Sequence, residues 1–367
     1  MKKFKHFSRG KTCMNIKRIL ALMAMLVVLV LAACGGGTED KENGEEATDS
    51  DAGSSDESLV IRLSHNQPLE SPEHAGAAKF KEVIEEKSEG KVTVEIFPAS
   101  QLGSLREQIE GTQMGEINIT MQPTAFVTPF VDDVKVIDLP YLWPADAEQT
   151  YEVLDSEAGQ AVLDTLEAGG FKGLGFWPGG FKLFTTGDKE IHAPEDFKGL
   201  DIRVMSSPLL EEQYKLWGAN PTMIEYAEVY NSLQQGVVDG HENPLQSIYL
   251  NNYHEVQNNI IESYHGIMSY LFMANKAWYD GLSEDVQALI KEAEEAGKTA
   301  AREALADTED EFRQSIIDSG VNYYELTDEE IEKFREVSVP FHEEAYGTPE
   351  QQEILKQIKD KIEEVSK

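Results

Sequence analysis

Residues 196–204 read DFKGLDIRV, and residues 228–244 read EVYNSLQQGVVDGHENP. In the first stretch a turn ends at Gly199, and apolar residues then alternate with Asp201 and Arg203, which is the two-residue period of a strand with one buried face. The second stretch predicts a helix that ends at Gly236, because glycine readily adopts the left-handed turn that closes a helix before a short strand. Together the two stretches predict alternating helices and strands.

The same alternation is visible upstream. Residues 59–65 form an expected strand, a helix starts at Ser71-Pro72 and ends at Gly90, and a second strand over residues 92–96 stops at Pro98. Strand, helix and strand in that order make a βαβ unit, and such elements recur to about residue 280. We therefore expect an α/β fold with mostly parallel sheets.

Two features favour a chain with two lobes. Residues 107–118 repeat the order of residues 228–239, namely helix, glycine, short strand and then Asn or Asp. Residues 283–320 lack an internal proline and carry an apolar stripe; a helix of that length would span ~54 Å, more than one lobe of this size. We expect this long C-terminal helix to brace both lobes.

The N-terminus has the order of a signal peptide. Residues 1–33 hold seven Lys and Arg and no acidic residue, and their apolar run, residues 19–33, would reach ~22 Å as a helix, short of the ~30 Å hydrocarbon core. The run ends Leu31-Ala-Ala-Cys34-Gly, which resembles the bacterial lipobox and implies a lipid on Cys34. An ordinary signal peptide followed by a buried cysteine is the alternative. Processing at the lipobox would also remove Cys13.

Residues 34–58 are predicted to be a tether. They are acidic and rich in Gly and Ser and contain no aromatic residue, so they cannot bury enough apolar surface to fold. The whole chain of 367 residues has a formal net charge of -35, which excludes a general nucleic-acid binder. Such acidity would suit a saline or alkaline exterior, where charge maintains solubility.

The sequence contains no catalytic signature. It has no G-x-S-x-G elbow, H-E-x-x-H motif or Walker loop, and the glycine pattern at Gly173 has Pro178 where its third glycine is needed. Its eight histidines show no metal-ligand spacing, and two cysteines cannot build a disulfide framework. We expect no enzyme activity, no metal site and no cofactor.

The two quoted stretches resemble, in order and spacing, the central motifs of the solute receptors of tripartite ATP-independent periplasmic (TRAP) transporters of the dicarboxylate-binding type. Residues 98–103, 138–142 and 275–278 fit the same family, and the resemblance covers about residues 59–340. It implies a two-lobed clamshell of the periplasmic-binding-protein-like class (type II). Lobe 1 would hold residues 59–181 and about 269–308, and lobe 2 residues 182–268 and about 309–367.

The resemblance also implies the ligand contacts. Arg203 would form a two-pronged salt bridge with a substrate carboxylate, as the planar guanidinium allows, and Asn243 would donate its amide to the same group. Tyr226 would close over the ligand, unless it is a core residue. Lys182 stands near the position of a second arginine in the family and would supply a second positive anchor.

Three further residues are expected to line the ligand site on the side of lobe 1. His65 and Asn66 at the end of the first strand and Trp177 in a later crossover would line it, with a purely structural role as the alternative. Residues 122–126 lack the Glu and Arg that the sialic-acid receptors of the family place there. This departure argues against sialic acid as the ligand.

We therefore expect an extracytoplasmic receptor that is anchored through Cys34 to the outer face of a Gram-positive membrane. It would close on a small organic acid, such as a C4-dicarboxylate, and deliver it to the TRAP membrane permease subunits, which use an ion gradient. Keto acids, uronates and hydroxy acids remain open as ligands. A ligand-sensing lipoprotein, an ABC-type binding protein and, last, an extracellular lyase are the alternatives.

Overall fold

The computed structural model describes residues 59–367. The predictions for the signal peptide, for lipidation of Cys34 and for the tether lie outside the described residues.

One mixed sheet organises the fold. Its strands follow the order β2-β1-β3-β8-β4-β7-β5-β6, and β9 pairs with β8. The strands are β1 (Leu59–His65), β2 (Val92–Phe97), β3 (Ile119–Pro123), β4 (Phe171–Thr186), β5 (Asp201–Val204), β6 (Asn220–Met223), β7 (Gly240–Pro244), β8 (Asn259–Asn275) and β9 (Asn322–Glu325).

The pairing is parallel towards both ends of the sheet and antiparallel in its middle. β1 pairs in parallel with β2 and β3, and β5 with β6 and β7. β4 and β8 instead pair antiparallel with each other and with β7 and β3. The α/β prediction is confirmed, and the long central strands explain why the sheet is mixed.

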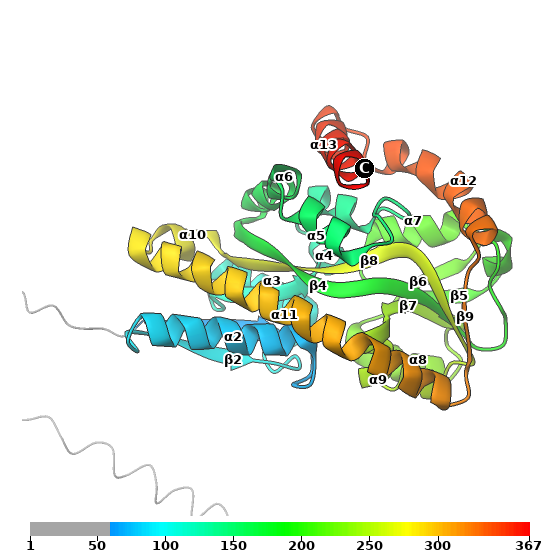
Figure 1. The fold of residues 1–367 in the computed structure, drawn as a ribbon, viewed down its shortest axis with the longest axis horizontal. Coiled ribbons are helices and arrows are strands. Elements are labelled where there is room, and N and C mark those ends of the chain that lie inside the picture. Colours follow the sequence, from blue (N-terminus) through cyan, green and yellow to red (C-terminus); the bar gives the residue numbers. More distant parts are fainter. Residues whose placement is uncertain (1–58) are drawn as a thin grey trace, which may run out of the picture. The chain divides into compact units, whose positions relative to one another are not determined.

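The two central strands, β4 and β8, are the longest of the sheet and lie side by side in Figure 1. The stretch of β4 that ends at Phe181 pairs with β8 from Ile267 onward, and the stretch that starts at Leu183 pairs with β8 up to Glu262. The residues of β8 between Glu262 and Ile267 are therefore skipped in the register. The sheet thus has an irregular seam across its middle.

Helices connect most of the strands along the chain, and α12 and α13 follow the last strand. They are α2 (Pro72–Lys87), α3 (Leu105–Met114), α4 (Thr124–Val127), α5 (Ala147–Leu154), α6 (Glu157–Thr165), α7 (Pro208–Leu216), α8 (Val229–Gln234), α9 (Leu245–Leu250), α10 (Lys276–Asp280), α11 (Glu284–Asp318), α12 (Asp328–Ala345) and α13 (Pro349–Val365). Short 3₁₀ turns are η1 (Asp132–Asp138), η2 (Leu166–Gly169), η3 (Pro194–Phe197), η4 (Tyr226–Glu228) and η5 (Tyr253–Glu255). The βαβ unit at the start is confirmed by β1, α2 and β2.

The long helix predicted over residues 283–320 is confirmed as α11. Ser283 caps it by accepting a hydrogen bond from the backbone N–H of Val286. Figure 1 shows α11 running alongside α2. The two helices approach closely at Gly76 and Gly297, where a Cβ atom on Gly76 would lie 2.6 Å from the carbonyl oxygen of Gly297.

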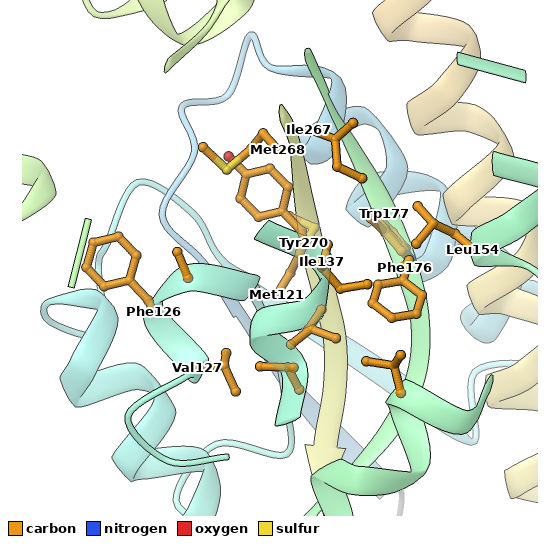
Figure 2. Close-up of a cluster of buried hydrophobic side chains, with 14 of the residues drawn as sticks. Met121, Phe126, Val127, Ile137, Leu154, Phe176, Trp177, Ile267, Met268 and Tyr270 are labelled. Atoms are coloured by element: carbon orange, nitrogen blue, oxygen red, sulfur yellow. The ribbon is translucent and has the colours of Figure 1, made fainter. Parts of the chain in front are cut away.

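Helix α11 contributes to both hydrophobic cores of the described chain. Its Ile290 and Ala301 belong to the larger core, and its Phe312 belongs to the smaller one, where it stacks on Tyr249 of α9. Figure 2 shows part of the larger core, with Phe176 and Trp177 on β4 and Met268 and Tyr270 on β8. Among residues 59–367 no helix is long and apolar enough to cross a membrane.

The internal repeat has a structural counterpart. Gly115 and Gly236 both adopt positive φ, at 83° and 66°, in the turn that follows a helix. The predicted position of the short strand was wrong in both places, because β3 and β7 begin only after Asn118 and Asp239. Farther along, the carboxamide of Asn118 accepts from the backbone N–H of Arg62 at 2.8 Å, and the carboxylate of Asp239 accepts from that of Asp201 at 2.8 Å. In both places one side chain joins the end of a helix–turn unit to the neighbouring parallel strand, which favours two related halves.

Candidate functional site

A small pocket lies where four strands end. β1 and β3 are parallel neighbours, as are β5 and β7, and the carboxyl ends of both pairs contribute to it. In open α/β sheets this edge is where ligands bind. The lining residues are Asn66, Gln67, Leu105, Pro123, Phe126, Arg203, Met205, Tyr226, Asn243, Ser247, Met268 and Tyr270.

Arg203 is the cation of this pocket. It stands on β5 opposite His241 of β7, and only 1% of its surface is exposed. Its Nε–H donates to the carbonyl oxygen of Ile224 at 3.0 Å, whereas its Nη2 has no hydrogen-bond partner in the described chain. Burial lowers the pKa of Arg203, yet a guanidinium stays protonated at neutral pH. A buried, fixed charge with a free donor edge is suited to a carboxylate.

Asn243 is placed beside it by β7. Its side-chain amide lies 2.8 Å from Nδ1 of His241, and 3% of the residue is exposed. Burial, and next the charge of Arg203, lower the pKa of His241 to about 3, so this imidazole is neutral near pH 7. The neutral ring accepts one amide proton of Asn243 and fixes the orientation of that side chain. The second amide proton stays available for a ligand.

The remaining polar groups come from both ends of the sheet. Tyr226 in η4 is partly buried and donates to Oδ1 of Asn251 at 3.0 Å. Tyr270 of β8 accepts from Gln67 at 2.5 Å. Oδ1 of Asn66 and Oγ of Ser247 are buried and find no partner within residues 59–367. The pocket thus offers unpaired polar atoms opposite the free edge of Arg203, beside apolar walls such as Phe126 and Met268.

Four of the seven predicted binding residues meet in this pocket: Arg203, Asn243, Tyr226 and Asn66. The other three lie elsewhere, each for a physical reason.

Lys182 does not line the pocket, which corrects its assignment as a second anchor. Its Nζ lies 3.0 Å from Oδ1 of Asp138 and 3.1 Å from Oε1 of Glu242, and all three side chains are at most 1% exposed. Glu242 also accepts from His265 and Tyr214, at 2.8 and 3.1 Å. The charge of Lys182 is therefore satisfied inside the protein and is not offered to a ligand.

Trp177 and His65 do not line the pocket either. The Trp177 ring stacks on Phe272 at 4.6 Å, and its Nε1 donates to Glu294 of α11 at 3.0 Å. His65 is fully buried, with Nε2 3.2 Å from Nδ1 of His74 on α2. Successive residues at a strand end point to opposite sides, so Asn66 reaches the pocket and its neighbour His65 does not.

Several residues that line the pocket were not predicted from the sequence as ligand contacts. Met205 directly follows the DFKGLDIRV stretch, and Ser247 lies close behind the second stretch, so extending both motifs would have found them. Tyr270 carries no such signal, because it enters the pocket through the pairing of β8 with β3, where it lies opposite Pro123. Within the described residues no group of three or more His, Cys, Asp or Glu could hold a metal ion.

Comparison with known proteins gives a consistent set of matches. The model of the family described as bacterial extracellular solute-binding protein, family 7, matches residues 63–348. The C4-dicarboxylate-binding periplasmic protein DctP of Rhodobacter capsulatus is 37% identical over 290 residues, which is 78% of this chain and 86% of that protein.

Solved structures match over a slightly larger share of the chain. A TRAP periplasmic solute binding protein from Desulfovibrio salexigens with bound orotic acid is 31% identical, with a TM-score of 0.80 over 84% of this chain and 99% of that chain. One from Sulfurospirillum deleyianum with bound succinate is 31% identical, with a TM-score of 0.76 over 82% and 98%.

Proposed function

This chain belongs to family 7 of the bacterial extracellular solute-binding proteins, the solute receptors of TRAP transporters, and on that premise we propose that it binds a small organic acid. It is a binding protein and not an enzyme, and its family acts outside the cytoplasm together with a membrane permease. The ligand, the residues that hold it and the anchoring of the chain are the parts we infer.

The observation that carries the ligand class is Arg203. Its guanidinium is buried without an ion pair to any described acidic residue, and Nη2 is unpaired. An uncompensated buried charge is costly, so such an arrangement is retained where a ligand supplies the missing anion. Both succinate and orotic acid, bound by the two similar receptors, carry a carboxylate.

We assign the two ends of the ligand separately. One carboxylate binds between Arg203 and Asn243, and the rest of the molecule lies against Asn66, Gln67 and Tyr270. Because Lys182 is neutralised internally, the far end meets neutral hydrogen-bonding groups only. This favours an acid whose far end is a hydroxyl, keto or amide group, or a C4-dicarboxylate that uses neutral donors there.

We infer that binding closes two lobes. Lobe 1 comprises residues 59–181 and about 269–308, and lobe 2 residues 182–268 and about 309–367. The irregular seam of β4 and β8 lies at this division, and Gly180 and Tyr264 beside it have positive φ of 92° and 48°. The pocket takes Asn66 from one side and Arg203 from the other, so a ligand that touches both favours the closed state.

We also infer that the mature chain is held on the outer face of a Gram-positive membrane by a lipid on Cys34, and that an ion gradient drives its permease. Support for the anchor comes from the order of basic residues, apolar run and Leu31-Ala-Ala-Cys34-Gly in the sequence.

A thermal-shift screen tests the ligand class. The panel contains succinate, malate, pyruvate, D-glucuronate and orotate, and the proteins are wild type, Arg203→Ala and, as a matched control, Arg106→Ala on the exposed face of α3. We expect at least one acid to raise the melting temperature of wild type and of the control, but not of Arg203→Ala. A panel that stabilises all three proteins alike, or none, would remove the role of Arg203.

A further inference from the structure

A buried carboxyl group joins helices α2 and α9. Glu73, in the first turn of α2, is 0% exposed, and its Oε1 accepts from Nε2 of Gln246 in α9 at 2.6 Å. The same Nε2 donates to the carbonyl oxygen of Gly179 at 3.1 Å, beside the seam of β4. Glu73 does not line the ligand pocket.

The contact crosses the division between the proposed lobes. Helix α2 lies in residues 59–181 and α9 in residues 182–268, so an opening of the lobes would separate Glu73 from Gln246 and admit water to the carboxyl group. This step rests on the proposed function, because it takes the lobe closure from there.

Glu73 and Gln246 each have one oxygen atom that receives no hydrogen bond from the described chain. Oε2 of Glu73 and Oε1 of Gln246 are both buried acceptors for which the described chain provides no partner. No described Lys, Arg or His forms an ion pair with Glu73. A proton on Oε2 would supply the missing donor and remove the uncompensated charge.

The groups that face Glu73 do not neutralise it. Those nearby are His74 on its own helix and Tyr151, Tyr226 and Tyr270 from α5, η4 and β8, and burial holds the pKa of His74 below its usual value. On the neighbouring α11, Glu309 is acidic, and Arg302 is engaged by Asp155 at 2.6 Å. Burial accordingly raises the pKa of Glu73 to about 7, although its own backbone N–H, Gln246 and Ser71 act in the opposite direction.

We propose that Glu73 takes up one proton from solvent when the lobes close, so that ligand binding is coupled to protonation and strengthens as the pH falls. In the open state the carboxyl is wet and has an ordinary acidity near pH 4.5; in the closed state it holds its proton up to about pH 7. Between these values the closed state binds more protons than the open state, so affinity decreases with rising pH. Outside them affinity is constant with respect to this group.

Titration calorimetry tests the coupling. Orotate and succinate are titrated into wild type, Glu73→Gln and the control Glu86→Gln, which alters an exposed residue of the same helix. Each protein is measured at pH 5.5, 6.5 and 7.5 in two buffers of different ionisation enthalpy. Orotate keeps its charge over this range, and any titration of succinate is common to the three proteins. The Gln variant keeps an acceptor for Gln246 and adds a donor.

We expect the dissociation constant of wild type and of Glu86→Gln to rise about tenfold or more from pH 5.5 to 7.5, with proton uptake, and that of Glu73→Gln to stay nearly constant. Equal pH dependence and equal proton uptake in all three proteins would overturn the proposal.

A second measurement separates failure of this proposal from failure of the proposed function. If neither acid binds any of the proteins, the ligand assignment fails, and hydrogen–deuterium exchange of the ligand-free chains then decides on Glu73. Exchange of α9 in wild type is expected to accelerate relative to Glu73→Gln as the pH rises from 6 to 8. Equal exchange of the two proteins at each pH would refute the role of Glu73.

Discussion

Arg203 and the backbone carbonyl of Ile224 are joined by a hydrogen bond of 3.0 Å from Nε. This bond helps to fix the plane of the guanidinium, and Nη2 has no hydrogen-bond partner in the described chain. The protein thus orients the group with one neutral acceptor and does not neutralise it with an acid. Orientation without neutralisation is what a receptor for a carboxylate requires, because the ligand itself then completes the charge balance.

Replacing Arg203 should lower the affinity for the ligand without lowering the stability of the ligand-free protein. We expect Arg203→Ala to weaken binding of the stabilising acid ~30-fold or more, because the loss of a buried charge partner costs about 2–5 kcal/mol. Arg203→Lys should not restore it, since an ammonium cannot bind a carboxylate in two-pronged fashion. Without ligand, Arg203→Ala should unfold at the same or a higher denaturant concentration than wild type. A clear loss of ligand-free stability would show that the charge is already compensated in the protein.

Replacing Lys182, in contrast, should lower the stability of the protein and not its affinity for the ligand. Lys182→Met leaves Asp138 and Glu242 as buried acids without their cation, so we expect about 3–5 kcal/mol less stability in chemical denaturation. Lys172→Met, which removes an exposed ion pair with Glu167, is the control and should cost under about 1 kcal/mol. If Lys182→Met lowered ligand affinity while leaving stability unchanged, its exclusion from the site would be wrong.

The crossing of α2 and α11 should tolerate no added methyl group. In Gly76→Ala the new Cβ would stand 2.6 Å from both the Gly297 carbonyl and the Trp177 ring, so we expect about 1–3 kcal/mol of destabilisation. Gly281→Ala is the control, because its Cβ would meet neighbours only at 3.4 Å or more and its φ is negative. Similar melting temperatures for the two variants would contradict the close packing.

Glu294 should make stability depend on pH. Burial raises its pKa to about 7, above the unfolded value of 4.5, so between these values the folded state binds more protons than the unfolded state. The free energy of unfolding should therefore fall as pH rises through this window, by up to about 1.4 kcal/mol per unit from this group. Glu294→Gln, which keeps an acceptor for Trp177, should make the profile measured by urea denaturation at pH 5, 6 and 7 less steep. An unchanged slope would exclude Glu294 as its source.

Cys34 should carry the membrane anchor. Cells that express the wild-type chain and are fed labelled palmitate should yield a labelled protein in the membrane fraction, and Cys34→Ser should remove both the label and the membrane retention. Cys13→Ser is the control, since that residue would be discarded with the signal peptide. Label retained on Cys34→Ser would refute the lipobox assignment.

Much of the fold could be predicted because local patterns determine its elements. The strand around Arg203 and the proline-free stretch of α11 depend on residues close in the sequence, and both elements appear in the structure. The expected single buried face of the strand does not, because Arg203 is buried together with Ile202 and Val204. The mixed character of the sheet was not predicted. It depends on the antiparallel pairing of β4 with β8, which lie far apart in the sequence.

The motifs in the sequence were enough to single out Arg203 and Asn243 as ligand contacts, whereas the adjacency of their strands follows from the pairing of β5 with β7. Which cation is available to a ligand depends on contacts between segments that are distant in the sequence. Arg203 and Lys182 are both strand residues with 1% exposure, but Asp138 and Glu242, at separations of 44 and 60 residues, neutralise Lys182 alone. Charge compensation acts through space between distant segments, so no local pattern records it, and the same holds for the bond between Glu73 and Gln246.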